Sequence, residues 1–292
     1  MCTGPRFGGE NMFALLMRIA SSTAITLIMR FSDKKTSNNM AMFMANYAVC
    51  SCLSYYYMTG AGTQVFQNAE GIGFTIGIGL ISGIWYLAAF LFMQWNMREN
   101  GVVLSSTFNR LGVLVPTIMA MTVFKESPKM IQIIGIVIAL VAIVLMQFEK
   151  GGDQGGNKKI WLVVMLLSSG FCDSLTNVYD KLGNPILKDN YLLYTFFVAL
   201  ISAVILTIRE RNKISKWDLI FGFIIGVPNY YSSRFMFEAL KTVPAMIAYP
   251  VSSVGTILAI SVGSVVLFKE KVSNQKKFAL VLVMAAMALL NM

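Results

Sequence analysis

Long apolar stretches, separated by short clusters of charged residues, decide what this chain can fold into. A transmembrane helix needs about 20 such residues, and ten stretches of suitable length are present. Barrel strands alternate polar and apolar residues, and the segment MIQIIGIVIALVAIVLMQF does not. The sequence therefore predicts an all-α membrane protein with ten transmembrane helices, at about 11–30, 40–59, 72–96, 102–124, 130–148, 160–180, 191–208, 217–240, 245–268 and 277–292.

Composition agrees with a membrane location. Charged residues make up 13% of the 292 residues, whereas a soluble domain carries about 25%. The first stretch contains Arg18 and continues directly into the following pattern, so it is interpreted as a span and not as a cleavable signal peptide. The net charge of +10 comes from loop lysines and arginines beside the membrane. We therefore expect these residues to contact anionic lipids and not nucleic acid.

The histidine and cysteine content limits the chemistry that this chain can perform. The chain has no histidine, which excludes histidine-based nucleophilic catalysis, histidine metal sites and histidine proton relays. Its four cysteines, at positions 2, 50, 52 and 172, have no metal-ligand spacing. Neither an enzymatic activity nor a metal or other cofactor is expected.

A weak internal repeat divides the chain into two halves. VFKESPK (123–129) parallels LFKEKVS (267–273) at an offset of 144, and the segments 80–98 and 223–241 parallel each other at an offset of 143. Asp33-Lys34 likewise matches Asp180-Lys181. The Gly-rich stretch EKGGDQGGNKK lies between the halves, so the predicted units are 1–148, a linker at 149–159, and 160–292.

Two glycine pairs also correspond within this repeat. Gly79 and Gly83 match Gly222 and Gly226, and each pair forms a small-xxx-small stripe that lets two helices approach closely. A unit with five crossings has an odd number, so its second copy enters the membrane from the opposite side. Inverted repeats of this kind are typical of transporters, with the substrate site near the midplane between the halves.

Ten spans arranged as five plus five, with FKES and FKEK between the fourth and fifth spans of each half, resemble the drug/metabolite transporter superfamily, EamA-like branch. The resemblance covers nearly the whole chain and implies secondary transport of a small metabolite. It also implies that the fifth and tenth helices are peripheral. The sequences IIGIVIALVAIVLM and FALVLVMAAMALL agree, since they contain no charged residue.

Charges in the loops predict the orientation. Three of the 24 lysines and arginines lie within spans, and fifteen of the others fall on the face opposite the termini. The face with the termini holds six: Arg6, Lys125, Lys129, Lys181, Lys188 and Lys241. The positive-inside rule then predicts that both termini lie outside the cytoplasm. The expected location is a cell membrane, either plasma or inner. The family resemblance implies the opposite orientation.

Five ionisable residues lie inside or near the ends of spans, and such residues are functional-site hypotheses. They are Arg18, Arg110, Asp173, Arg234 and Glu238. Arg234 and Glu238 are four residues apart and could pair along one helix, which leaves Glu238 as an ion-pair partner or a rim residue. Asp173 has two open interpretations, as a structural partner of Arg18 or as an ion-coupling carboxylate.

Arg110 has no acid within a turn on its own helix. A guanidinium offers five fixed donors that match carboxylate or phosphate and it does not deprotonate, so Arg110 is the first candidate for an anion receptor. Asn109, with Ser105 and Ser106 one turn earlier, would extend the polar patch. The alternative is an ion pair with Asp173 across the halves. Pro116 is expected to kink the helix below the arginine.

Further aromatic and polar residues are candidates for the site. GVPNYYSSR places Tyr230 beside Pro228, and AYPVSSVG places Tyr249 beside Pro250, at points where transporter helices bend around substrate. Trp85 aligns within one residue with that first segment. These aromatic rings either stack on a substrate or pack between helices. Asn177 lies one turn after Asp173 and faces the same way.

The five intramembrane charges sum to 3 − 2 = +1, which favours an anionic or zwitterionic substrate. The predicted function is secondary active transport of an amino acid, organic acid or sugar phosphate by alternating access, in a monomer or homodimer. Asp173 is the candidate for proton coupling. The alternatives are translocation of a phosphate-bearing lipid and export of amines or drugs. Multidrug exporters of the superfamily use a first-helix acid, and here Arg18 occupies that helix.

Overall fold

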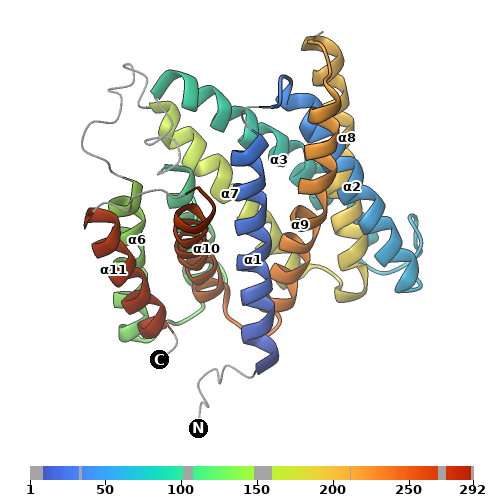
Figure 1. The fold of residues 1–292 in the computed structure, drawn as a ribbon. Helices are drawn as coiled ribbons and strands as arrows, with labels where there is room; N and C mark the ends of the chain where they lie inside the picture. The colour runs from blue at the N-terminus through green and yellow to red at the C-terminus, as the bar shows by residue number, and fades with distance from the viewer. Residues whose placement is uncertain are drawn as a thin grey trace.

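In a computed structural model, the protein is described over residues 9–32, 35–100, 108–147, 160–210, 212–268 and 274–290, and all regular secondary structure in these ranges is helical. The order of elements is α1 (Gly9–Ser32), α2 (Asn39–Gly60), α3 (Ile72–Asn100), α5 (Leu114–Thr122), α6 (Met130–Gln147), α7 (Ile160–Leu182), η1 (Pro185–Leu187), α8 (Lys188–Glu210), α9 (Lys216–Leu240), α10 (Ala245–Phe268) and α11 (Asn274–Leu290) (Figure 1).

Within the described ranges, five helical segments are long and apolar enough to cross a membrane. These are Met12–Ser32, Ile72–Met93, Ile160–Leu182, Pro185–Glu210 and Ala245–Gly263, and Met130–Leu145 is a shorter apolar helix. The predicted all-helical class is therefore confirmed, while ten spans and an inverted repeat stay predictions. Several residues used for the repeat, namely 33–34, 149–159 and 269–273, lie outside the described ranges, and so do Ser105 and Ser106.

The fourth predicted stretch contains a break beside Arg110. Residues 108–111 are helical, Gly112 and Val113 form a turn, and α5 begins at Leu114. Pro116 falls in the first turn of α5, where backbone N–H groups have no acceptor within the helix, so its missing N–H costs no intrahelical hydrogen bond. The break therefore precedes the proline. At this point α7 comes so close that an added Cβ on Gly112 would lie 2.2 Å from Ser169 Oγ.

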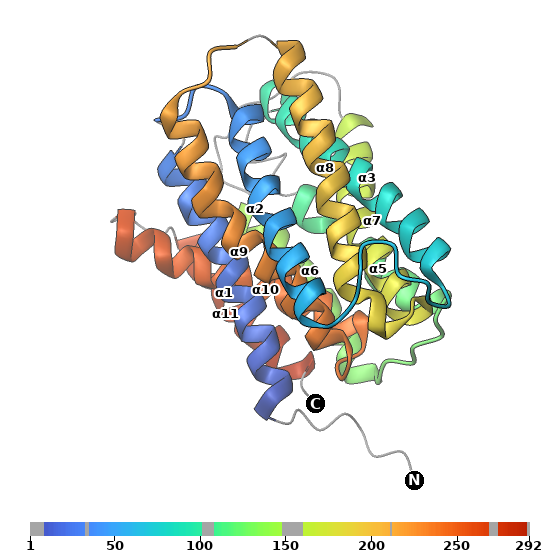
Figure 2. The same ribbon diagram turned by 90° about the vertical axis from the view of Figure 1, so that its right-hand side faces the viewer.

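Helices of the two predicted halves interleave. The first three helices pack on the second set, α1 against α9 and α10, α2 against α8 and α9, and α3 against α7 and α8. Figure 2 shows α2 lying between α8 and α9. Because neither set buries its apolar faces without the other, the two sequences form one packed bundle.

The predicted glycine stripes mediate two of these contacts. An added Cβ would lie 2.7 Å from Tyr194 Cβ at Gly79 and 2.5 Å from Thr195 O at Gly83, both on α8. At Gly222 and Gly226 it would lie 2.3 Å from Met42 O and 2.5 Å from Val49 Cβ, both on α2. A side chain at any of the four glycines would push the helices apart. The expected close approach of α3 and α9 to a neighbouring helix is confirmed.

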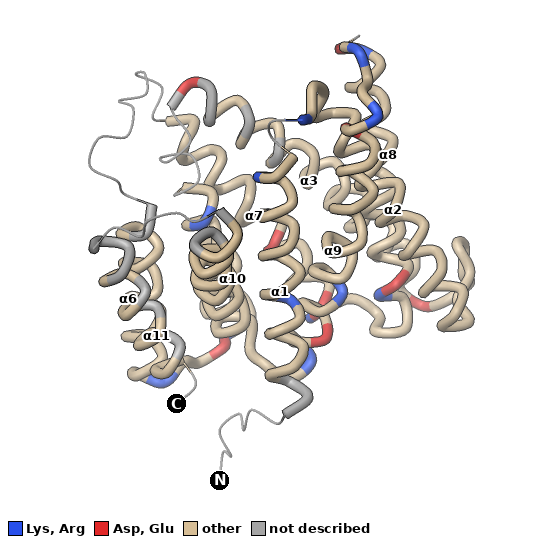
Figure 3. Tube along the Cα trace, in the orientation of Figure 1, with Lys and Arg blue, Asp and Glu red and all other residues tan. Residues whose placement is uncertain are grey.

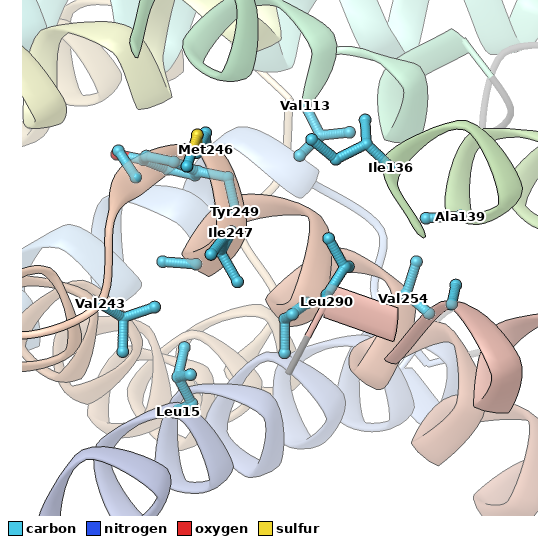
Figure 4. Close-up of a cluster of buried hydrophobic side chains, with 14 of the residues drawn as sticks. Leu15, Val113, Ile136, Ala139, Val243, Met246, Ile247, Tyr249, Val254 and Leu290 are labelled. Atoms are coloured by element: carbon cyan, nitrogen blue, oxygen red, sulfur yellow. The ribbon is translucent and has the colours of Figure 1, made fainter. Parts of the chain in front are cut away.

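One hydrophobic core surrounds α10. It includes Leu15, Val113, Ile136, Val254 and Leu290, contributed by α1, the turn before α5, α6, α10 itself and α11 (Figure 4). Helices α6 and α11 pack on each other and lie together at one side of the bundle in Figure 1. Their position fits the peripheral role that the family resemblance implies for the fifth and tenth helices.

Candidate functional site

Three charged residues from three separate elements form a polar cluster inside the bundle. Arg18 comes from α1, Arg110 from the short helical segment 108–111 before α5, and Asp173 from the middle of α7. The electrostatic fields of both arginines act on the Asp173 carboxyl, and the two arginines act on each other. Figure 3 shows how sparse charged residues are along the middle of the described helices. A group of three there is the strongest candidate for a functional site.

Neither of the two ion pairs considered from the sequence forms. Among the described residues, Asp173 is at ion-pair distance from neither Arg18 nor Arg110. The Asp173 carboxylate therefore shares the field of two arginines without a direct bond to either. A cluster of this kind leaves hydrogen-bonding capacity on all three side chains, which a fully paired structural lock would not.

Arg18 is held from one side by α9. Its Nη1 donates hydrogen bonds to the carbonyl oxygen of Ser232 at 2.9 Å and to its Oγ at 2.7 Å. The Ser22 Oγ lies 3.0 Å from the same Ser232 hydroxyl. The Nε of Arg18 is buried and has no hydrogen-bond partner among the described residues. Part of this guanidinium is thus fixed and part is unsatisfied.

Asp173 is surrounded by polar groups of neighbouring helices. The hydroxyl of Tyr249 on α10 donates to the carbonyl oxygen of Asp173 at 2.7 Å. Tyr86 on α3 and Tyr249 both lie within electrostatic range of the carboxyl. Asn177, one turn further along α7, is fully buried, and neither polar atom of its side chain has a partner in the described part of the chain. Buried amides are nearly always bonded, so Asn177 marks a place where a polar ligand would be satisfied.

Arg234 belongs to a second cluster with its own acid. It forms an ion pair with Asp189 at the start of α8, donates to the Tyr230 hydroxyl at 2.9 Å, and lies 4.1 Å from the centre of the Tyr57 ring. The rings of Tyr57 and Tyr230 stack at 5.6 Å. Arg234 is therefore neutralised by Asp189 and lies over one aromatic ring, unlike the two arginines around Asp173.

The expected pair between Arg234 and Glu238 does not form. Glu238 lies on the surface and pairs with Lys241 at 2.6 Å, three residues along the same helix. The physical reason is packing: the Arg234 side chain turns toward α8 and α2, where Asp189 is available. Glu238 has a rim position, which was one of its two interpretations.

Trp85 and Asn109 lie at the edge of the site. The Trp85 Nε1 donates to Ser168 O at 3.0 Å, and its ring packs edge-on against Phe171 in a groove of about 570 Å³ between α3 and α7. The groove is lined by Ile81, Trp85, Phe92, Val164, Leu167, Ser168 and Phe171, with no charged residue among them. Asn109 contacts α7 through its carbonyl oxygen, which accepts a 3.3 Å bond from Ser169 Oγ.

Sequence reasoning missed Ser232, Ser22 and Tyr86. Serines are common in membrane helices, where the hydroxyl usually bonds to its own helix, so their spacing carries no signal. Tyr86 is adjacent to Trp85, and only the helix rotation shows that the tryptophan packs against Phe171 of α7 while the tyrosine ring packs against Phe196 of α8.

This arrangement can be compared with known proteins. The sequence profile of the EamA-like transporter family matches residues 160–292. The second half of the chain is an EamA-like domain. It contains Asp173 of the polar cluster, together with Asn177, Ser232 and Tyr249 around it.

Relatives extend the comparison to the rest of the chain. An uncharacterized protein of Haemophilus influenzae is 22% identical over 276 residues, which is 90% of this chain and 92% of that protein. A WAT1-related protein of Arabidopsis thaliana is 33% identical over 78 residues, covering 27% of this chain and 20% of that protein. One crystal structure of another protein superimposes with a TM-score of 0.74 at 11% identity, covering 95% and 97% of the two chains.

The EamA-like domain and its relatives confirm the resemblance to the drug/metabolite transporter superfamily. Together with the apolar helices, they support a multi-pass membrane protein whose second half is similar to a transporter family. The structural similarity supports the fold over almost the whole chain.

Proposed function

We propose that this protein is a secondary transporter of a small anionic or zwitterionic metabolite, such as an amino acid, an organic acid or a sugar phosphate. The observation that carries the proposal is the cluster of Arg18, Arg110 and Asp173, which holds two positive charges and one negative charge without a direct ion pair among the described residues. An anionic group between the arginines would balance the excess of 2 − 1 = +1 and would satisfy donors that now lack acceptors.

Alternating access between two inverted five-helix halves is the proposed mechanism. The glycine contacts support it, because α3 packs on α8 through Gly79 and Gly83 while its repeat counterpart α9 packs on α2 through Gly222 and Gly226. The second and seventh predicted spans are also counterparts, so each contact is the repeat image of the other. Movement of one half against the other would occur around a cluster to which both halves contribute.

We also propose the partners, the membrane orientation and the oligomeric state of the transporter. Its partners are the substrate and the surrounding lipids, in a cell membrane with both termini outside the cytoplasm, as a monomer or homodimer. The orientation rests on the loop charges, and a reporter fused after Met292 that is active in the cytoplasm would overturn it.

The substrate class is tested by thermal unfolding of the purified protein with a panel of carboxylates and organic phosphates. We expect at least one anion to raise the melting temperature of the wild type and to have no effect on Arg110→Ala. Lys241→Ala is the matched control, because Lys241 is an exposed cation outside the cluster. Equal stabilisation of the Arg110→Ala variant would contradict the proposed role of this residue.

Proton coupling through Asp173 is the second part of the proposal. A carboxyl without an ion pair, beside two arginines, gains or loses a proton according to whether an anion neutralises those arginines. We expect transport into proteoliposomes to depend on pH in the wild type and to lose that dependence in Asp173→Asn. A variant with an unchanged pH profile would exclude Asp173 as the coupling group.

The rival substrates fit the cluster less well. An amine or cationic drug would be repelled by the excess positive charge of Arg18 and Arg110. A phosphate-bearing lipid would need a lateral path from the membrane to those arginines. The groove beside Trp85 is apolar and has no charged residue in its lining, so it offers no polar path for a headgroup.

A further inference from the structure

The guanidinium of Arg18 is divided into a fixed part and a part left for a ligand. Both hydrogen bonds that hold it use Nη1, one to the carbonyl oxygen and one to the Oγ of Ser232. Nε is buried without an acceptor, and Nη2 has no hydrogen bond to any described residue. Nε–H and one Nη2–H point the same way along one edge of the planar group. That edge is a two-donor fork that matches the two oxygens of a carboxylate.

We propose that Ser232, supported by Ser22, is a positioning residue that turns the Nε–Nη2 edge of Arg18 toward the carboxylate of the substrate. The inference rests on the proposed transport of an anion and goes further. It assigns the bidentate contact to Arg18 and leaves Arg110 as a second positive charge nearby. It also names two serines that set the orientation of the fork.

Burial explains why the orientation matters. A buried donor without an acceptor is costly, and native structures rarely keep one without a reason. Arg18 retains a buried, unbonded Nε although Ser232 offers two oxygen acceptors to the same guanidinium, both of them bonded to Nη1. The serines therefore satisfy the opposite side of the guanidinium and do not cover the fork. A carboxylate bound to Nε and Nη2 would complete the hydrogen bonds of Arg18.

The contact also joins the two predicted halves. Arg18 and Ser22 lie on α1, and Ser232 lies on α9, against which α1 packs. Without the Ser232 hydroxyl, Nη1 would keep a single bond to a carbonyl oxygen and the guanidinium would rotate more freely. A loosely held fork loses more entropy on binding than a fixed one, so affinity for a carboxylate should fall while folding is preserved.

The test measures thermal stabilisation of the purified full-length protein by L-lactate, L-alanine, L-glutamate and inorganic phosphate, with lactamide as the uncharged control. Ser232→Ala should weaken carboxylate binding about tenfold, which is the loss expected for one hydrogen bond to a charged group. Ser232→Thr keeps the hydroxyl and should restore binding. Arg18→Lys should abolish it, because an ammonium cannot form the two-donor fork.

Ser233→Ala is the matched control, since Ser233 is the buried neighbour of Ser232 and has no hydrogen bond to Arg18. The affinity of Ser233→Ala for the carboxylates should equal that of the wild type, and only Ser232→Ala should bind them more weakly. If Ser233→Ala weakens binding as much as Ser232→Ala, the effect is general packing and the inference is wrong.

The remaining outcomes separate this inference from the proposed function. Carboxylate binding that requires Arg110 but survives in Ser232→Ala and Arg18→Lys would overturn the inference alone. Stabilisation by phosphate but by no carboxylate would overturn the carboxylate assignment. If no anion of the panel stabilises the wild type, the proposed transport of such anions fails, and the role of Ser232 fails with it.

Discussion

Replacement of Gly83 by alanine tests how closely α3 and α8 are packed. An added Cβ would lie 2.5 Å from the carbonyl oxygen of Thr195 and 2.6 Å from Val198 Cβ. Non-bonded carbon atoms have their optimal separation at about 3.5–4.0 Å, so one helix would have to move by roughly 1 Å. The nearest atom belongs to the backbone of α8, and rotation of a side chain cannot relieve the clash.

Two opposing terms set the magnitude. Alanine in place of glycine within a helix normally stabilises by about 0.5–1 kcal/mol, because glycine loses more backbone entropy on folding. Overpacking of a tight interface costs about 1–3 kcal/mol. At Gly83 the second term should dominate. Gly77 on the same helix has no atom within 4 Å of an added Cβ, so Gly77→Ala retains only the favourable term.

The assay is the midpoint of unfolding of the purified protein in mixed detergent, measured for the wild type and both variants. We expect Gly83→Ala to lower the midpoint and Gly77→Ala to raise it slightly. If both variants shift it in the same direction by the same amount, α3 and α8 do not approach as closely as described, and the explanation of the glycine stripe is refuted.

Three further substitutions test two ion pairs and one helix N-terminus on the side of the bundle where α9 ends and α10 begins. Arg234→Gln should destabilise the fold by about 1–3 kcal/mol because it leaves Asp189 without its partner, whereas Glu238→Gln, in an exposed pair, should change stability by less than about 0.5 kcal/mol. Glu126→Gln should cost about 1 kcal/mol, because Glu126 accepts bonds from the first N–H groups of α10. Both effects are read from detergent unfolding midpoints, and an Arg234→Gln variant as stable as Glu238→Gln would contradict the first.

Patterns that depend on spacing along one helix were predictable from the sequence. The Gly79–Gly83 and Gly222–Gly226 pairs predicted close helix contacts because residues four apart lie on one face, whatever the neighbouring helix is. Asp173 and Asn177 were placed on one face by the same reasoning.

The residue pairs that form between different helices were not predictable from the sequence. Glu238 had the right spacing for Arg234, but Asp189, 45 residues away, is the actual partner, because α9 packs on α2 and the arginine side chain lies over the Tyr57 ring, within reach of the start of α8. Ser232 gave no signal, since its role depends on where α1 crosses α9. Rotation of a helix about its own axis decides such contacts, and a hydrophobic pattern that is apolar on most sides leaves that rotation undetermined.

Glu126, in the FKES sequence of the first half, is connected to the surroundings of Asp173 by its bonds to helices of the second half. Its carboxylate accepts hydrogen bonds from the N–H groups of Ala245 at 3.3 Å and Met246 at 3.0 Å, and it pairs with Lys181 on α7 at 2.9 Å. One turn after Ala245, Tyr249 donates its hydroxyl to Asp173 O. The glutamate therefore fixes the start of the helix that carries Tyr249. Any movement that separates the 123–129 loop from α10 must break these bonds, and that movement would also change the polar surroundings of Asp173.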